Sequence, residues 1–91
     1  MAYDVHLLEP ADQFLAELEV KMRAKAFRSL ALLEHFGPQL PMPHAKQLVG
    51  YDLHELRVRQ GSNICRLFYF FDHEAIIVVT SGYRKKSDRI D

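Results

Sequence analysis

Residues 55–72, ELRVRQGSNICRLFYFFD, decide the fold of this chain. Apolar and polar side chains alternate before the turn, and aromatic residues crowd the run that follows it. A period of two is typical of a strand with one buried face. The glycine-containing segment Gly61-Ser62-Asn63 between the two runs indicates a tight turn. We therefore expect a hairpin whose strands are residues 53–60 and 64–71.

A third strand and a leading strand complete the predicted sheet. The short polar segment 72–74 reads as another turn, and the β-branched run that follows it predicts a strand over residues 75–83. Three strands joined by short turns form an antiparallel meander. Near the start of the chain, residues 3–8, YDVHLL, predict one further short strand.

Helical spacing of apolar residues extends over residues 10–36. Pro10 suits the first turn of a helix, and Gly37-Pro38 is a stop signal. A break near residues 19–22 divides the pattern into two helices. We expect their core-facing stripe to contain Phe14, Leu18, Met22, Phe27 and Leu30.

Residues 37–51 hold three of the four prolines and predict a connecting segment. The element order is β-α-α-β-β-β. The fold class is therefore α+β, a small mainly antiparallel sheet with two N-terminal helices packed on one face. At 91 residues, the chain is expected to form a single domain over residues 1–91.

Composition excludes several classes of protein. Lysines and arginines equal acids at 12 each, so net charge alone does not demand a nucleic-acid partner, although residues 57–91 hold seven basic and four acidic residues. The single cysteine, Cys65, favours a reducing cytoplasm and reads as a small buried residue. No signal peptide or membrane-spanning run is recognisable, and the scattered histidines do not suggest a metal site. We expect a cytoplasmic protein without membrane contact or cofactor.

Strict alternation along the strands predicts where the arginines point. Arg57 and Arg59 share the face opposite the core, and Arg66 stands among aromatic residues on that face. If the registers agree, Arg84 joins them. Two interpretations remain open for this set. The arginines can be ordinary solvent-facing charges, with Glu55 in a weak surface ion pair with Arg57 or Arg59, or they can form a site for an anion.

The segment ELRVRQGSNICRLFYFF, followed by IIVVTSGYRKKSDR, resembles the phage-derived Gp49-like/HigB branch of the RelE/ParE toxin superfamily. The resemblance extends over nearly the whole chain. It implies the toxin of a type II toxin–antitoxin module that cuts mRNA in the ribosomal A site and so inhibits translation. It also implies a cognate antitoxin, expected to be a helix-turn-helix protein, and chemistry without a metal.

By position, the resemblance implies roles for particular residues. Its catalytic basic positions correspond to Arg57, Arg59, Arg66 and Arg84, and its RNA-binding cluster to Lys85, Lys86 and Arg89. Fixed guanidinium groups would stabilise the extra charge of a pentacoordinate phosphorus more than the ground state.

The group that handles protons is less clear from the sequence. Some relatives carry a tyrosine where this chain has Ile90. The candidates here are Tyr83, which alternates to the face opposite Arg84, His54, which alternates to the helix side, and a lysine of the basic cluster.

Two other functions compete with mRNA cleavage. A toxin of this fold can act on another target such as DNA gyrase. The chain can also be a catalytically inactive, phage-derived binding protein.

Overall fold

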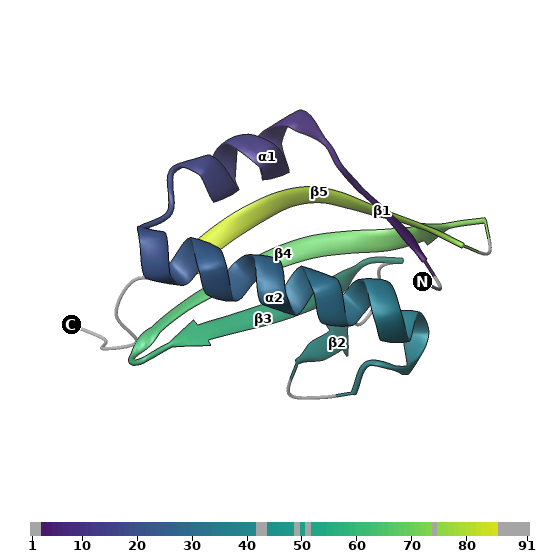
Figure 1. Ribbon diagram of the computed structural model, residues 1–91. Coiled ribbons are helices and arrows are strands. Elements are labelled where there is room, and N and C mark those ends of the chain that lie inside the picture. The colour runs from purple at the N-terminus through teal and green to yellow at the C-terminus, as the bar shows by residue number, and fades with distance from the viewer. Residues whose placement is uncertain (1–2, 42–43, 49, 51, 74, 86–91) are drawn as a thin grey trace.

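The computed structural model describes residues 3–41, 44–48, 50, 52–73 and 75–85. In chain order the elements are β1 (Asp4–Leu7), α1 (Glu9–Ala16), α2 (Val20–Phe36), a 3₁₀ turn (Gly37–Gln39), β2 (Ala45–Gln47), β3 (His54–Gln60), β4 (Asn63–Asp72) and β5 (Ile76–Lys85). Both helices lie on the same side of one sheet (Figure 1). The predicted α+β class and the packing of the two helices on one face are confirmed.

The sheet has five strands in the order β1-β5-β4-β3-β2. Three of its four strand pairings are antiparallel, whereas β1 at one edge runs parallel to β5. The predicted meander is therefore correct, but the predicted element order was incomplete. Strand β2 pairs with the first half of β3 inside the segment that we expected only to connect. Three residues are too few to show a recognisable alternation.

A short break at residues 17–19 separates the two helices, close to the predicted position. The guanidinium of Arg23 on α2 reaches back across it and donates hydrogen bonds to the carbonyls of Leu15 (3.1 Å), Ala16 (3.2 Å) and Leu18 (2.8 Å). Carbonyl groups at the end of a helix lack partners within the helix, so these bonds satisfy them. Arg23 thereby holds the end of α1 against α2. No helix in the described part of the chain is long and apolar enough to cross a membrane.

The core lies between the helices and the sheet. Its buried side chains come from α1 (Ala11, Leu15), α2 (Met22, Ala26, Leu30, Leu33) and the central strands (Leu56, Val58, Cys65, Leu67, Tyr69, Ile77, Val79). The expectation that Phe27 belongs to this core was wrong, since its side chain is 46% exposed. Successive side chains of an α-helix point about 100° apart around its axis. Because Ala26 faces the core, the side chain of Phe27 points to the side of α2.

A bulge in β5 changes which side chains face the helices. Phe68 on β4 lies opposite Ser81, but the next residue, Tyr69, lies opposite Val79, so Thr80 is the extra residue. A bulge of one residue inverts the alternation of side chains beyond it. Before the bulge the odd-numbered residues of β5 face the core, and after it the even-numbered residues do.

Gly82 shows the inverted alternation directly. A Cβ atom at this position would overlap the ring of Phe14 on α1. The helix-facing side of β5 beyond the bulge therefore requires a residue without a side chain, so that α1 can lie close to the sheet.

Candidate anion-binding face

Three side chains form a row across the middle of the helix-free face of the sheet. Arg57 on β3 lies directly opposite Arg66 on β4, and Arg66 lies directly opposite Tyr83 on β5. Residues opposite each other on neighbouring strands project from the same face. We call this set the cross-strand row. The predicted grouping of Arg57 with Arg66 is confirmed by the register of the hairpin.

The register makes the two arginines of the row direct cross-strand neighbours. The backbone N–H of Arg57 points away from β4, because it donates to the carbonyl of His44 at 2.8 Å. Arg57 and Arg66 therefore form a non-hydrogen-bonded antiparallel pair, the kind in which Cα atoms are about 4.5 Å apart and side chains are closest. Like charges directly opposite each other destabilise a sheet. An anion bound between them would relieve that repulsion.

A single carboxylate compensates part of this charge. Glu55 Oε2 lies 2.7 Å from Arg66 Nε, and the two side chains are only 11% and 19% exposed. The Nε–H has no aligned acceptor among the described residues, so the contact is a close ion pair without a directed hydrogen bond. The expected weak surface pair of Glu55 with Arg57 or Arg59 was therefore wrong, since the partner is Arg66 and the pair is mostly buried. None of the ion pairs among the described residues includes Arg57.

Removing this carboxylate should destabilise the fold. We expect Glu55→Gln to lower the free energy of unfolding by roughly 1–3 kcal/mol, because Arg66 loses its charged partner in a poorly hydrated position. The measurement is urea unfolding.

The matched control is Glu19→Gln. Glu19 is 71% exposed and 3.9 Å from Arg84, and an exposed pair contributes about 0–1 kcal/mol. Equal losses in the two variants would show that burial does not strengthen the Glu55–Arg66 pair.

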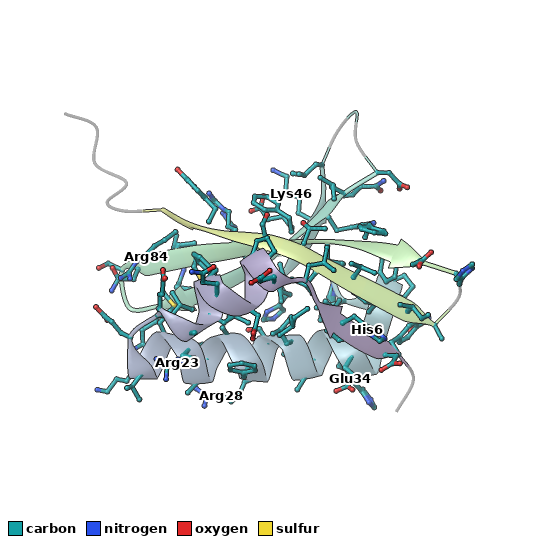
Figure 2. The ribbon with its side chains drawn as sticks, turned by 90° about the horizontal axis from the view of Figure 1, so that it is seen from above. His6, Arg23, Arg28, Glu34, Lys46 and Arg84 are labelled. Atoms are coloured by element: carbon teal, nitrogen blue, oxygen red, sulfur yellow. The ribbon has the colours of Figure 1, made fainter. Side chains whose placement is uncertain are left out.

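Further cations border the row. Arg59 is two residues beyond Arg57 on β3 and shares its face by alternation. Lys46 on β2 lies directly opposite Glu55, on the side of the sheet away from α2 (Figure 2). The sequence pointed to no role for Lys46, and the only signal would have been a short strand hidden between prolines and glycines.

The basic cluster that follows β5 is only partly visible. The backbone of Lys85 lies opposite Ile64, at the margin of the same face. The side chain of Lys85 and all of Lys86 and Arg89 lie outside the described part of the chain. Their RNA-binding role stays a prediction.

Arg84 does not join the other arginines, and the predicted convergence of four was wrong in this respect. It lies opposite Cys65, whose side chain faces the core, and its guanidinium is 3.9 Å from Glu19 beside α2. Figure 2 shows Lys46 and Arg84 on opposite sides of the sheet. The cause is the bulge at Thr80, which strict alternation does not anticipate.

The same bulge brings Tyr83 to the helix-free face that carries Arg57 and Arg66, which we call the arginine face. Its side chain is 54% exposed and stands next to Arg66 across the strand pair. Of the three proton-handling candidates, Tyr83 is therefore on the arginine face and His54 is not, and the lysine side chains of the basic cluster lie outside the described part of the chain. His54 stacks on Tyr69 at 5.2 Å between ring centroids and meets the edge of Phe71 on the helix side, as predicted.

Burial lowers the pKa of His54, while the charge of Asp52 acts in the opposite direction. The unfolded chain therefore binds a proton at higher pH than the folded protein. The stability due to His54 is present above the unfolded pKa, near 6.5, and is lost as the pH falls through the folded value.

We expect His54→Gln to reduce the loss of unfolding free energy between about pH 7.5 and 5.5, measured by urea unfolding across that range. An unchanged pH dependence would show that this ring does not titrate with folding.

The remaining reactive groups do not form a second site. Cys65 is fully buried, and burial raises its pKa to about 11 although the charge of Arg84 acts against this. A thiol in that state is a poor nucleophile. Among the residues that the structure describes, no three histidine, cysteine or acidic side chains gather as metal ligands would.

Several solved structures share the fold of this chain. It resembles a chain of the intact E. coli RelBE toxin–antitoxin complex, with a TM-score of 0.74 and 21% identity over 93% of this chain and 99% of that one. The isolated E. coli RelE toxin gives a TM-score of 0.74 and 21% identity, over 96% of this chain and 89% of that one. In the archaeal RelE–RelB complex from Pyrococcus horikoshii, the matching chain gives 0.69 and 20%, over 92% and 96%.

At this level of identity the likeness shows a shared fold. Among curated protein sequences there is no significant match to this chain. A family profile does match, and it extends over residues 13–91. The chain therefore belongs to the family described as phage-derived protein Gp49-like, and it has the fold of the RelE toxins.

Proposed function

We propose that this protein is the HigB-type toxin of a type II toxin–antitoxin module, an endoribonuclease that cuts mRNA in the ribosomal A site. The observation that carries the proposal is the cross-strand row, where two arginines and a tyrosine meet on the helix-free face. The RelE fold supports it, since the similar structures are toxins or toxin–antitoxin complexes. The cytoplasm is the matching location, because translating ribosomes are there.

The chemistry that fits the row needs no metal. The 2′-OH oxygen of one nucleotide attacks the adjacent phosphorus and its proton passes to solvent water, while a cyclic phosphate forms and the bond to the 5′-oxygen breaks. The phosphorus passes through a five-coordinate state with additional negative charge. Arg57 and Arg66, already facing one another, would stabilise that state more than the substrate, which is what lowers a barrier. Glu55 would hold Arg66 in place.

The departing 5′-oxygen needs a proton. We assign this role to Tyr83, because its phenolic O–H is a donor and because Tyr83 lies directly opposite Arg66 on the neighbouring strand. His54 is on the other face and does not serve.

The charged margins of the face would hold the RNA on either side of the cleaved bond. Arg59 and Lys46 flank the row within the sheet. Lys85, Lys86 and Arg89 are assigned to the same task from their position in the chain. Arg84 is on the helix side of the sheet and is not assigned to phosphate binding.

The partner of such a toxin is a cognate antitoxin, which we expect to be a helix-turn-helix protein encoded beside it. The similar E. coli and P. horikoshii structures are complexes of RelE with RelB. An adjacent reading frame of that kind is the simplest observation in favour of the module.

The decisive experiment maps mRNA ends after the protein is induced. We expect cleavage within A-site codons. The downstream fragments should begin with a free 5′-OH, and the upstream fragments should end in a 2′,3′-cyclic phosphate. An mRNA with a 2′-deoxy nucleotide at the cleaved position should stay intact. Growth arrest without new ends would instead indicate a RelE-fold toxin with another target, such as DNA gyrase, and absence of arrest an inactive binding protein.

A further inference from the structure

An aromatic side chain lies beside the cross-strand row, on the same face of the sheet. Phe68 is two residues from Arg66 along β4, and both alternate with the buried side chains of Leu67 and Tyr69, which face the core. The rise of a strand places the Cα atoms of Phe68 and Arg66 about 7 Å apart. The Phe68 ring is therefore within reach of a nucleotide whose phosphate Arg66 holds.

The neighbours of Phe68 on the flanking strands are polar. Glu55 on β3 and Ser81 on β5 lie directly opposite it. The ring is half-buried, so part of it faces solvent between these polar groups. An aromatic ring contributes most to stability when it is packed against apolar surface. Packing within the sheet therefore does not account for an aromatic residue at this position.

Phe70, the next residue on the same face of β4, provides a contrast. It is also half-buried, but it lies opposite Val78 on β5. A pair of an aromatic and a β-branched residue on neighbouring strands stabilises a sheet. Phe70 is about 13 Å from Arg66 along the strand. Cross-strand packing explains Phe70, and its distance separates it from the cross-strand row.

The bulge in β5 holds the backbone of Phe68 in place. Thr80, the extra residue, donates a hydrogen bond from Oγ1 to the carbonyl oxygen of Phe68 at 3.2 Å. The same irregularity brings Tyr83 to the arginine face. Bulges are common next to active sites, where they change the direction of a side chain. One local feature therefore positions both Tyr83 and the strand segment that carries Phe68.

The proposed chemistry orders the RNA across the strands. In-line attack places the 2′-oxygen and the departing 5′-oxygen on opposite sides of the phosphorus. Tyr83, the proton donor for the 5′-oxygen, is on β5 at one end of the cross-strand row. A phosphate held by Arg66 in the middle of the row therefore has its upstream nucleotide, which carries the 2′-OH, on the side of Arg57 and β3.

The base of this upstream nucleotide has two directions along the strands. On one side of the row β3 and β4 carry Arg59 and Ile64, and on the other side they carry Glu55 and Phe68. Bases bind by stacking on aromatic rings, whereas cationic side chains bind phosphates. The ring of Phe68 therefore matches the base, and Arg59 matches a neighbouring phosphate.

We propose that Phe68 stacks on the base immediately upstream of the cleaved bond, and that this contact positions the 2′-OH for attack. The inference rests on the proposed function for the identity of the RNA and of the bond that breaks. Stacking on a ring tolerates any base, because each base has a π face. The contact therefore raises the efficiency of cleavage without selecting one codon.

The first test removes the ring and keeps an apolar side chain. We expect Phe68→Leu to lower kcat/KM for cleavage of mRNA on programmed ribosomes at least about fivefold, the lower limit for the loss of one stacked base. Phe68→Trp, which keeps an aromatic ring, should retain most of the wild-type efficiency. Phe70→Leu is the matched control and should cleave as the wild type does. Urea unfolding shows whether each variant is folded.

The second test removes the base from the substrate and uses the wild-type chain. An mRNA with an abasic nucleotide immediately upstream of the cleaved bond should be cleaved less efficiently, by the same factor as Phe68→Leu causes. Phe68→Leu should lose nothing further with this substrate, since the contact is already absent. Effects of two changes that do not contact each other multiply instead. The abasic substrate gives a result even if Phe68→Leu does not fold.

A third measurement observes stacking without cleavage. A 2-aminopurine base is placed at each A-site position in turn, in an mRNA whose 2′-deoxy riboses prevent attack. The wild-type chain should quench the fluorescence of this base at one position, and Phe68→Leu should not. Quenching that depends on Phe68, from a chain that never cleaves mRNA, would refute the proposed function alone.

The inference about Phe68 is overturned by any of four results. These are wild-type efficiency in a folded Phe68→Leu variant, an equal loss in Phe70→Leu, losses that multiply between Phe68→Leu and the abasic substrate, and absence of quenching by the wild-type chain. In each of these cases mRNA cleavage itself can persist, so the proposed function is judged separately.

Discussion

Replacing Arg66 by lysine should lower the rate of the proposed mRNA cleavage by about 10²–10³-fold, the usual cost of losing one preorganised donor to a developing charge. Lysine keeps the positive charge beside Glu55, which lies 2.7 Å from Arg66 Nε, so the buried ion pair is retained. It lacks the planar fork that binds two phosphate oxygens at once. Single-turnover cleavage on programmed ribosomes, together with growth after induction, measures the effect.

The choice of lysine matters because Arg66→Ala has two consequences. It removes the phosphate-binding group, and it leaves Glu55 mostly buried without its cation. Breaking such a pair costs about 3–5 kcal/mol, enough to unfold many small domains. The double variant Glu55→Gln with Arg66→Gln avoids the unpaired charge and should be folded and inactive.

Arg28→Lys on α2 is the matched control, and it should cleave at the wild-type rate. If Arg66→Lys and the double variant are folded, expressed at equal levels and fully toxic, Arg66 is not part of the site.

Alternation along the strands predicted the face on which Arg66 lies, but not the register of the hairpin. We expected Gly61, Ser62 and Asn63 to form the turn, whereas Asn63 is the first residue of β4 and lies opposite Gln60. Gly61 supplies the positive φ of 63° that this tighter turn requires. The pairing of Arg57 with Arg66 follows from the observed register.

The residues of β5 that share a face with Arg57 and Arg66 could not be predicted in the same way. Its bulge falls at Thr80, within a run of β-branched and small residues that carries no glycine or proline at the irregular position. The packing of α1 against Gly82 accompanies the inverted face, and that contact joins residues far apart in the chain. Because of this one extra residue, Tyr83 lies on the arginine face and Arg84 lies on the other.

Two further differences between the expected and the observed structure also arise from tertiary contacts. Strand β2 has no stable pattern of its own, and it exists because the edge of β3 is available for pairing. Phe27 satisfied the helical spacing, but the core beneath α2 is filled by Met22, Ala26 and Leu30. Apolar spacing identifies a helix better than it identifies which face of the helix is covered.

Tyr83→Phe should lower the cleavage rate by about 10²–10⁴-fold, the usual contribution of a positioned proton donor. The change removes only the hydroxyl, since the phenylalanine ring keeps the position opposite Arg66 and can still stack on a base. The variant should therefore cleave bound mRNA more slowly, while its affinity for the mRNA stays the same. Tyr3→Phe, on a tyrosine packed beside Gly37 at the end of α2, is the matched control and should be as active as the wild type.

The role of the hydroxyl can be separated from a structural one by changing the substrate. A bridging sulfur in place of the 5′-oxygen departs without needing a proton, because a thiolate is a far weaker base than an alkoxide. With that substrate Tyr83→Phe should regain most of the wild-type rate, whereas Arg66→Lys should stay slow, since its defect concerns the charge on the phosphate. If Tyr83→Phe remains equally impaired with the sulfur substrate, Tyr83 does not donate the proton and contributes only by packing or stacking.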